Sequence, residues 1–314
     1  MILEIQHETR LEYAGPVTES VTEVRMVPVS DARQSCRSFH LAVSPAAQVY
    51  NYQDGFGNRV HHFNVRSANS RVGILAASVV ETARSPFDPA GSSAAYPLNP
   101  GLTDLEAVAF LGFRGPVCRT PLLDPLLEKL RPAPGTRLAE FLLTVSAFIN
   151  THFTYAPAVT HASSPVDDVL RQGKGVCQDF AHLMIAVLRA FGLPARYVSG
   201  YVHRPGQESQ SHAWCEAWLP GVGWVGIDPT NDRPVDEPHV KVAVGRDFTD
   251  VPPNKGVYHG QARETIFVRV ETRALEHLPS LSWQEQLPPL HGPLTAIPSP
   301  ARDLPPRGED AQQQ

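Results

Sequence analysis

The chain has 314 residues, of which 42% are hydrophobic and 19% charged, a composition typical of a globular protein of about two domains. Its net charge of −5 argues against the strongly basic surface with which proteins bind nucleic acids or anionic membranes. No apolar run approaches the roughly 18 residues of a transmembrane helix, and the first ten residues lack the basic leader and apolar core of a signal peptide. The four cysteines show no paired spacing, so we expect free thiols in a cytoplasmic protein.

Residues 1–100 have the pattern of a β-sandwich domain followed by a linker. Short runs in which apolar and polar residues alternate, such as 61–65, are separated by turn residues. The segment Asp54–Arg59 predicts a hairpin, because its Gly and Asn residues tolerate the positive φ of tight turns. A stretch rich in Pro, Gly and Ser at 85–94 predicts the start of the linker.

Residues 101–275 predict a second domain in which helices come first and strands follow. Apolar residues three and four positions apart predict helices at 104–113, 121–130 and 137–150, a short helix starting near 165, and a buried helix at 177–191. Alternating or apolar runs predict strands at 195–202, 211–219, 223–227 and 264–270. Prolines recur after this domain, so residues 276–314 are predicted to form a largely disordered tail.

Cys177 is the candidate nucleophile. It follows the glycine-rich stretch Gly173-Lys174-Gly175-Val176 and opens a helix that is apolar nearly all round. The free backbone N–H groups and the dipole at a helix start stabilise a thiolate, and such placement lowers a cysteine pKa from about 8.5 to roughly 3.5–7.5. A cysteine that only fills space in a core is the alternative, so the residues downstream decide.

His212 and Asp228 are the candidate partners of this thiol. Along 211–218, alternation puts His212, Trp214 and Glu216 on one face of a strand. A hairpin centred near Pro220 would place Asp228 directly opposite His212, close enough for a hydrogen bond. Alone, each residue is also explained as a strand histidine or a turn-opening aspartate. Together they supply the base and the orienting group that a cysteine nucleophile requires.

The same residues carry a resemblance to the core of the bacterial transglutaminase-like superfamily. The similar segments are Gly175–Ala181, Leu188–Tyr201, Ser211–Trp214 and Trp224–Thr230. Asp54–Asn58 resembles part of the amino-terminal β domain that accompanies this core in many bacterial members. The resemblance covers roughly residues 1–272. It implies an α+β, papain-like core with Cys177 as nucleophile, His212 as base and acid, and Asp228 as the orienting carboxylate.

Three further residues are candidates for the substrate pocket or the oxyanion site. Tyr155 occupies a stretch that runs close to the active site in the resembling family. Gln178 lies in the first turn of the cysteine helix, where a capping role is an alternative, and Trp214 follows the histidine as a core or pocket-wall residue. No Cys and His pair has the spacing of a zinc site, so we expect neither metal nor cofactor.

These observations predict a cysteine enzyme that cleaves peptide or glutamine-type amide bonds through a thioester. Hydrolysis is the expected outcome, and transfer to an amine, as in a true transglutaminase, is the alternative. The other alternative is a catalytically silent binding or scaffold protein. The expected partner is a peptide or protein substrate, with no nucleic acid and no membrane, and the oligomeric state stays open.

Overall fold

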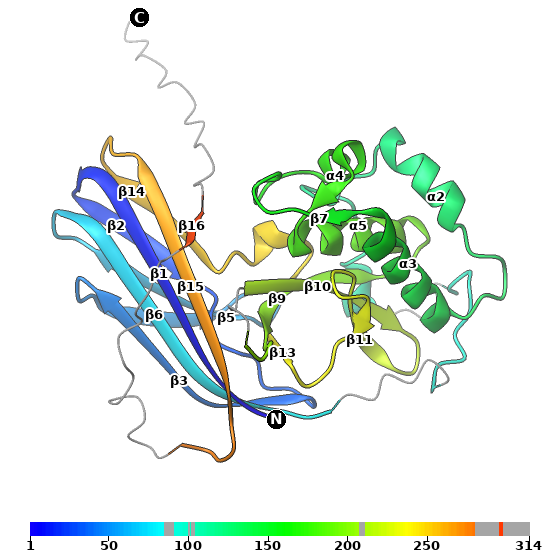
Figure 1. Ribbon diagram of the computed structural model, residues 1–314, viewed down its shortest axis with the longest axis horizontal. Helices are drawn as coiled ribbons and strands as arrows, with labels where there is room; N and C mark the ends of the chain where they lie inside the picture. The colour runs from blue at the N-terminus through cyan, green and yellow to red at the C-terminus, as the bar shows by residue number, and fades with distance from the viewer. Residues whose placement is uncertain (85–90, 100, 102–103, 207–210, 280–294, 298–314) are drawn as a thin grey trace, which may run out of the picture.

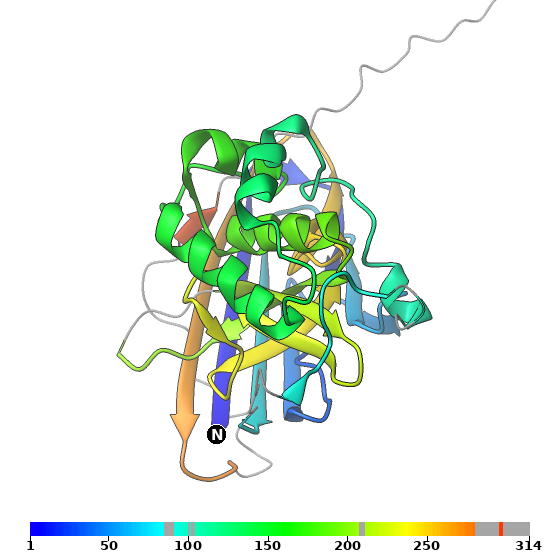
Figure 2. The same cartoon turned by 90° about the vertical axis from the view of Figure 1, so that its right-hand side faces the viewer.

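A computed structural model describes residues 1–84, 91–99, 101, 104–206, 211–279 and 295–297. It has a β-sandwich on one side, a group of helices on the other, and a five-stranded antiparallel sheet between them (Figures 1 and 2). The predicted α+β class, with an N-terminal β-sandwich and a papain-like core, is confirmed.

Two antiparallel sheets form the sandwich. The first has the strand order β16-β15-β1-β6-β3, with bounds Thr295–Ile297, Glu264–Leu275, Ile2–Val17, Asn69–Thr82 and Gln34–Ser44. The second has the order β14-β2-β5-β4, with bounds Asn254–His259, Glu19–Val24, Arg59–Val65 and Val49–Gln53. Their inner faces share a core that includes Leu11, Phe63 and Ile74. The predicted hairpin joins β4 to β5, and Gly57 in its turn has a φ of 82°, which glycine adopts without strain.

The end of the second domain was predicted wrongly, because the chain returns to the sandwich. β14 pairs with β2, and β15 pairs with β1 along its whole length, from Ile2↔Leu275 to Tyr13↔Glu264. Residues 254–275 therefore belong to the sheets of the first domain. Alternation identifies a strand but not its partner. Most of the predicted tail, 280–294 and 298–314, lies outside the described residues, while β16 pairs with β15.

The second domain places helices on one face of a sheet with the order β12-β11-β10-β9-β13. These strands span Arg233–Pro234, Gly223–Asp228, Ser211–Leu219, Ala195–Val202 and His239–Gly245. The helices are α1 (Leu105–Val108), α2 (Asp124–Leu130), α3 (Leu138–His152), α4 (Val166–Gln172) and α5 (Cys177–Ala190), with 3-10 turns at Pro121–Leu123 and Phe248–Asp250 and a two-strand ladder of β7 (Thr154–Tyr155) and β8 (Lys174–Gly175). The helix predicted at 104–113 is thus only one turn long.

Helix α5 is central in this domain. Its side chains from Phe180 to Arg189 are buried, and they share one hydrophobic cluster with residues of α3 and with Ala213, Cys215 and Ala217 of β10. The helix ends at Ala190, and Gly192 just beyond its C-cap has a φ of 79°, as expected for a left-handed cap. The other face of β10 carries Trp214 and Glu216 toward the sandwich.

Side-chain amides of the first domain complete the edge of this sheet. Strand β13 is an edge strand and would leave backbone groups unpaired. Asn58 accepts from the Val244 N–H and donates to the Val244 carbonyl, both at 2.8 Å. Gln34 does the same to Lys241, with 2.8 Å for both bonds. The two domains are therefore joined by backbone-like hydrogen bonds as well as by apolar contacts.

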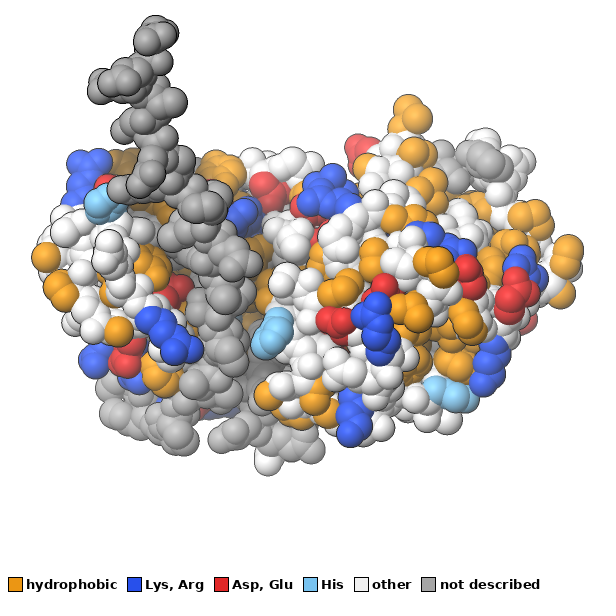
Figure 3. All heavy atoms as spheres, turned by 90° about the horizontal axis from the view of Figure 1, so that it is seen from above, with side chains coloured by type: hydrophobic (Ala, Val, Ile, Leu, Met, Phe, Trp, Pro, Cys, Tyr) orange, Lys and Arg blue, Asp and Glu red, His pale blue; other side chains and the backbone are white. Residues whose placement is uncertain are grey.

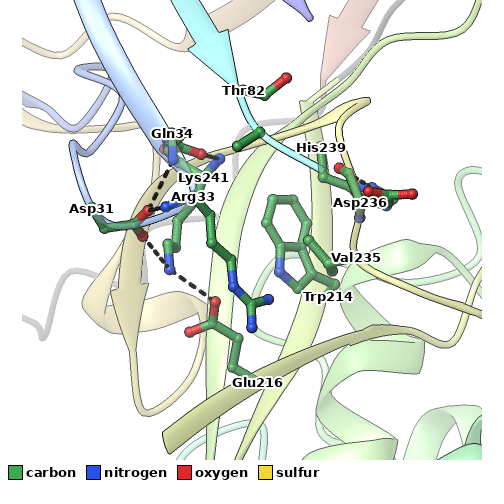
Figure 4. A pocket seen from close by; sticks show the side chains of 11 residues that line it. Asp31, Arg33, Gln34, Thr82, Trp214, Glu216, Val235, Asp236, His239 and Lys241 are labelled. Carbon is green, nitrogen blue, oxygen red and sulfur yellow. Dashed lines mark hydrogen bonds and ion pairs between the residues drawn. The ribbon is translucent and has the colours of Figure 1, made fainter. Parts of the chain in front are cut away.

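A buried charge network lies in the same interface, around a small pocket between the domains (Figure 4). The Glu216 carboxylate contacts Lys241 Nζ at 3.0 Å and Arg196 Nη2 at 2.6 Å, and Lys241 also contacts Asp31 at 2.9 Å. Burial alone would raise the pKa of Glu216, but Lys241 and Arg196 outweigh it and lower the pKa to about 2.

On the outer surface, charges of both signs are interspersed on the face seen from above (Figure 3). Within the described residues, every helix is too short or too polar to cross a bilayer.

Candidate active site

The local structure at the start of α5 fixes the position of Cys177. Val176 precedes the helix in an extended conformation, and its N–H donates to Asp179 Oδ2 at 2.8 Å. Thr160 Oγ1 donates to the same oxygen at 2.6 Å. A Cβ at Gly175 would lie 2.9 Å from Asp179, so only glycine fits the approach. Asp179 therefore caps the helix and braces the turn that presents the thiol.

His212 and Asp228 meet as the sequence predicted, although in a different register. The His212 Nε2 and Asp228 Oδ2 atoms are 2.8 Å apart, and the two side chains are 8% and 0% exposed. The hairpin pairs Leu219 with Gly223 and Glu216 with Gly226, so its centre is Gly221 and not Pro220. His212 and Asp228 are diagonal rather than direct neighbours. A shift of two residues keeps both on one face, because the side-chain period of a strand is two.

The protonation of His212 follows from its neighbours. Burial alone lowers the pKa of this imidazole, but hydrogen bonds with Asp228 and with the Cys177 side chain outweigh burial and raise the pKa to about 10. Because Nε2 faces the carboxylate, Nδ1 is the ring nitrogen available to the sulfur. His212 thus carries its positive charge beside Cys177.

Asp228 is held by more donors than His212 alone. Its Oδ2 is also 2.5 Å from Asn231 Nδ2 and 3.2 Å from His239 Nε2, and its Oδ1 accepts from the backbone N–H groups of Thr230 and Asn231. Burial alone would raise the pKa of Asp228, but the hydrogen bonds from His212 and His239 hold it well below its usual range. The carboxylate is therefore ionised and fixed in direction.

The three other candidate residues lie around this group in different ways. Tyr155 is 46% exposed, and burial together with the nearby Cys177 raises its pKa to about 12. Gln178 donates its side-chain amide to the Ala162 carbonyl at 2.8 Å and is thus engaged in the protein. Trp214 is 1% exposed and packs beneath His212, with 6.3 Å between ring centroids. It does not border open solvent, because its face of β10 is covered by the sandwich.

Sequence reasoning missed three residues of the site. Asn231 lies three positions after Asp228, in the turn that this aspartate was predicted to open. Arg204 Nη2 donates to Asn231 Oδ1 at 2.8 Å, and its charge reaches Tyr155. His239 comes from β13. The short spacing between Asn231 and Asp228 is the one signal in the sequence for these contacts. No local pattern predicts the contacts of Arg204 and His239.

The remaining cysteines and a helix histidine belong to the structural framework. Burial raises the pKa of Cys36 to about 11 and also raises that of Cys118 and Cys215. His182 of α5 is a core residue, since it is 1% exposed and its Nε2 accepts from the Phe248 N–H at 3.1 Å. Within the described ranges, no group of three His, Cys, Asp or Glu side chains is placed to hold a metal ion.

Comparison with known proteins matches both domains. Residues 127–229, which include Cys177, His212 and Asp228, match the transglutaminase-like superfamily, and residues 3–81 match the bacterial transglutaminase-like N-terminal region. An uncharacterized protein of Mycobacterium leprae is 34% identical over 286 residues, which is 87% of this chain and 99% of that protein. A protein-glutamine gamma-glutamyltransferase of Pseudomonas aeruginosa is 32% identical over 130 residues, 37% of this chain and 19% of the relative.

A solved structure shares the fold of nearly the whole chain. It is a provisionally named cysteine protease of Cytophaga hutchinsonii, with a TM-score of 0.73, 23% identity, and coverage of 89% of this chain and 93% of the other. The sequence matches and the shared two-domain fold lead to one assignment. This chain is a member of the transglutaminase-like superfamily, with the bacterial N-terminal β domain in front of the core.

Proposed function

We propose that this protein is a cysteine-dependent enzyme that cleaves peptide or glutamine-type amide bonds, with Cys177, His212 and Asp228 as its catalytic residues. The observation that carries the proposal is the 2.8 Å contact between His212 Nε2 and Asp228 Oδ2, made while the same imidazole interacts with the thiol at the start of α5. The nucleophile, the base and the orienting group therefore lie next to one another.

The reaction follows from these positions. The Cys177 thiolate attacks the amide carbonyl carbon, and the oxyanion faces the free backbone N–H groups at the start of α5. The tetrahedral intermediate collapses as protonated His212 gives its proton to the leaving amine, which leaves an acyl thioester on Cys177. Neutral His212 then takes a proton from water, hydroxide attacks the thioester, and the carboxylic acid is released with the thiolate restored.

Hydrolysis is the proposed outcome, and amine transfer is the second candidate. The name of the Pseudomonas relative, a gamma-glutamyltransferase, supports the second candidate over the matched 130 residues. The two differ only in whether water or an amine attacks the thioester.

Intact-mass measurement of the thioester on Cys177 tests the proposal. The protein is incubated with peptide libraries, with and without an added primary amine, and Cys177→Ala is the matched control. We expect an acyl adduct that decays to an acid in both conditions. Formation of a new amide only when amine is present would identify a transferase. No adduct, together with peptide binding that Cys177→Ala leaves unchanged, would identify a silent scaffold.

A second measurement uses the internal cysteine controls. Iodoacetamide at neutral pH is expected to label Cys177 faster than Cys36 and Cys118, whose pKa values burial raises. Equal or slower labelling of Cys177 would refute the activated thiol.

A further inference from the structure

His239 contacts the candidate triad from a strand that the reaction scheme does not use. Its Nε2 atom is 3.2 Å from Asp228 Oδ2, and both side chains are 0% exposed. The ring lies edge-on against Trp214, with centroids 5.4 Å apart at 78°. In a buried histidine, the hydrogen bonds of both ring nitrogens determine where the proton sits and how the ring is oriented.

The hydrogen bonds around the ring assign its proton. Asp228 is ionised and can only accept, so Nε2 carries a hydrogen. At the other nitrogen, Nδ1 is 3.2 Å from both the backbone nitrogen and the carbonyl oxygen of Asp236, and the same carbonyl accepts the His239 backbone N–H at 2.8 Å. The ring is therefore held at both nitrogens, with Nε2 donating to Asp228 and Nδ1 against the backbone of Asp236.

The first domain holds this ring in place. His239 begins β13, whose backbone is paired with Gln34 and Asn58. The turn before it is tied to the sandwich through Thr82 Oγ1, which donates to the Glu237 carbonyl at 2.8 Å. Trp214 and His239 also line the pocket between the domains (Figure 4). The position of His239 thus depends on both domains.

Sharing of one carboxylate oxygen has a chemical consequence. Oδ2 of Asp228 receives His212, His239 and Asn231 together. A second donor to this oxygen, such as His239, stabilises the carboxylate and reduces the negative charge that is available to the imidazolium of His212. His212 must lose its proton to the leaving amine, so an imidazolium that is held too strongly would be a poor acid.

We propose that His239 is a positioning residue that orients Asp228 and limits how tightly Asp228 holds the proton of His212, with the N-terminal sandwich fixing His239. This inference rests on the proposed function for its catalytic meaning. The polar groups that face or support His212 are Cys177 from α5, Asp228 from β11, His239 from β13, and Asn231 with Arg204 behind it.

Nitrogen-15 NMR of histidine-labelled full-length protein tests the proposal without any substrate. We expect the wild-type spectrum to show His239 protonated at Nε2. His239→Leu removes the donor and should raise the titration midpoint of His212 by about one pH unit, because the charge of Asp228 is divided among fewer donors. His239→Gln keeps an N–H donor and should leave the midpoint close to that of the wild type.

Two outcomes overturn the inference. One is a His239 ring without a proton on Nε2 in the wild type, which decides the matter even if His239→Leu does not fold. The other is a His212 midpoint that is the same in His239→Leu and His239→Gln, which would give His239 only a packing role. Thr82→Val tests the contribution of the first domain and should shift the midpoint in the direction of His239→Leu; an unchanged midpoint would contradict that part. An inactive enzyme with the expected spectrum would refute the proposed function but not this inference.

Discussion

Asp228→Asn isolates the charge that keeps His212 protonated. The two side chains are in contact at 2.8 Å and almost fully buried. Two unit charges about 4 Å apart at an effective dielectric constant of 20 interact by about 4 kcal/mol, which corresponds to about 3 pH units. Because the pKa of His212 is raised to about 10, loss of the Asp228 charge should bring it to about 7.

The rate constants of Cys177 with iodoacetate and iodoacetamide report this change. Iodoacetate is an anion, so its attack by the thiolate is favoured while His212 is positively charged, whereas iodoacetamide is neutral. The rate constant for iodoacetate divided by that for iodoacetamide, measured by site-resolved mass spectrometry between pH 6 and 10, should fall as the imidazolium of His212 loses its proton. We expect the fall near pH 10 in the wild type and near pH 7 in Asp228→Asn.

Asp232→Asn is the matched control for this experiment. Asp232 lies four residues after Asp228 and accepts from Ser146 Oγ at 2.8 Å, so its variant should behave as the wild type does. A midpoint in Asp228→Asn that stays within about half a pH unit of the wild-type value would refute the reasoning, because a one-unit change already corresponds to 1.36 kcal/mol.

Three further predictions concern stability. Asn58→Ala leaves the Val244 N–H and carbonyl without their partners, so we expect urea unfolding to show a loss of about 3 kcal/mol; a loss below about 1 kcal/mol would contradict the role of this amide. Gly175→Ala places a Cβ 2.9 Å from Asp179 and should cost about 1–3 kcal/mol in thermal unfolding and slow the labelling of Cys177, whereas unchanged values of both would be inconsistent with the tight approach. The pKa of Glu216 is lowered to about 2, so its stabilisation of about 3 kcal/mol is present above about pH 4.5 and is lost as the pH falls from there toward 2. Glu216→Gln should remove this loss from the pH dependence of urea unfolding, and an unchanged acid profile would count against it.

Some features of the site could be predicted from short stretches of sequence. The glycine approach and the apolar helix place Cys177 at a helix start, and alternation along β10 and β11 puts His212 and Asp228 on one face. This last prediction survived an error of one residue in the hairpin centre, because that error shifts the cross-strand pairing by two residues and the side-chain period is two. Side-chain direction repeats regularly along a helix or a strand, so the relative positions of residues within one helix or one hairpin can be predicted from their spacing in the sequence.

Contacts between distant segments could not be predicted in this way. The strand pattern of 264–270 was visible, but its pairing with β1, more than 250 residues earlier, depends on how the two sheets close around their core. His239 reaches Asp228 from an edge strand, and Asn58 reaches that strand from a hairpin 186 residues away. The sequence by itself identified Cys177, His212 and Asp228 as the candidate residues. Only the tertiary structure decided what surrounds the carboxylate, because a buried charge takes its partners from whichever segments the packed core brings within hydrogen-bonding distance.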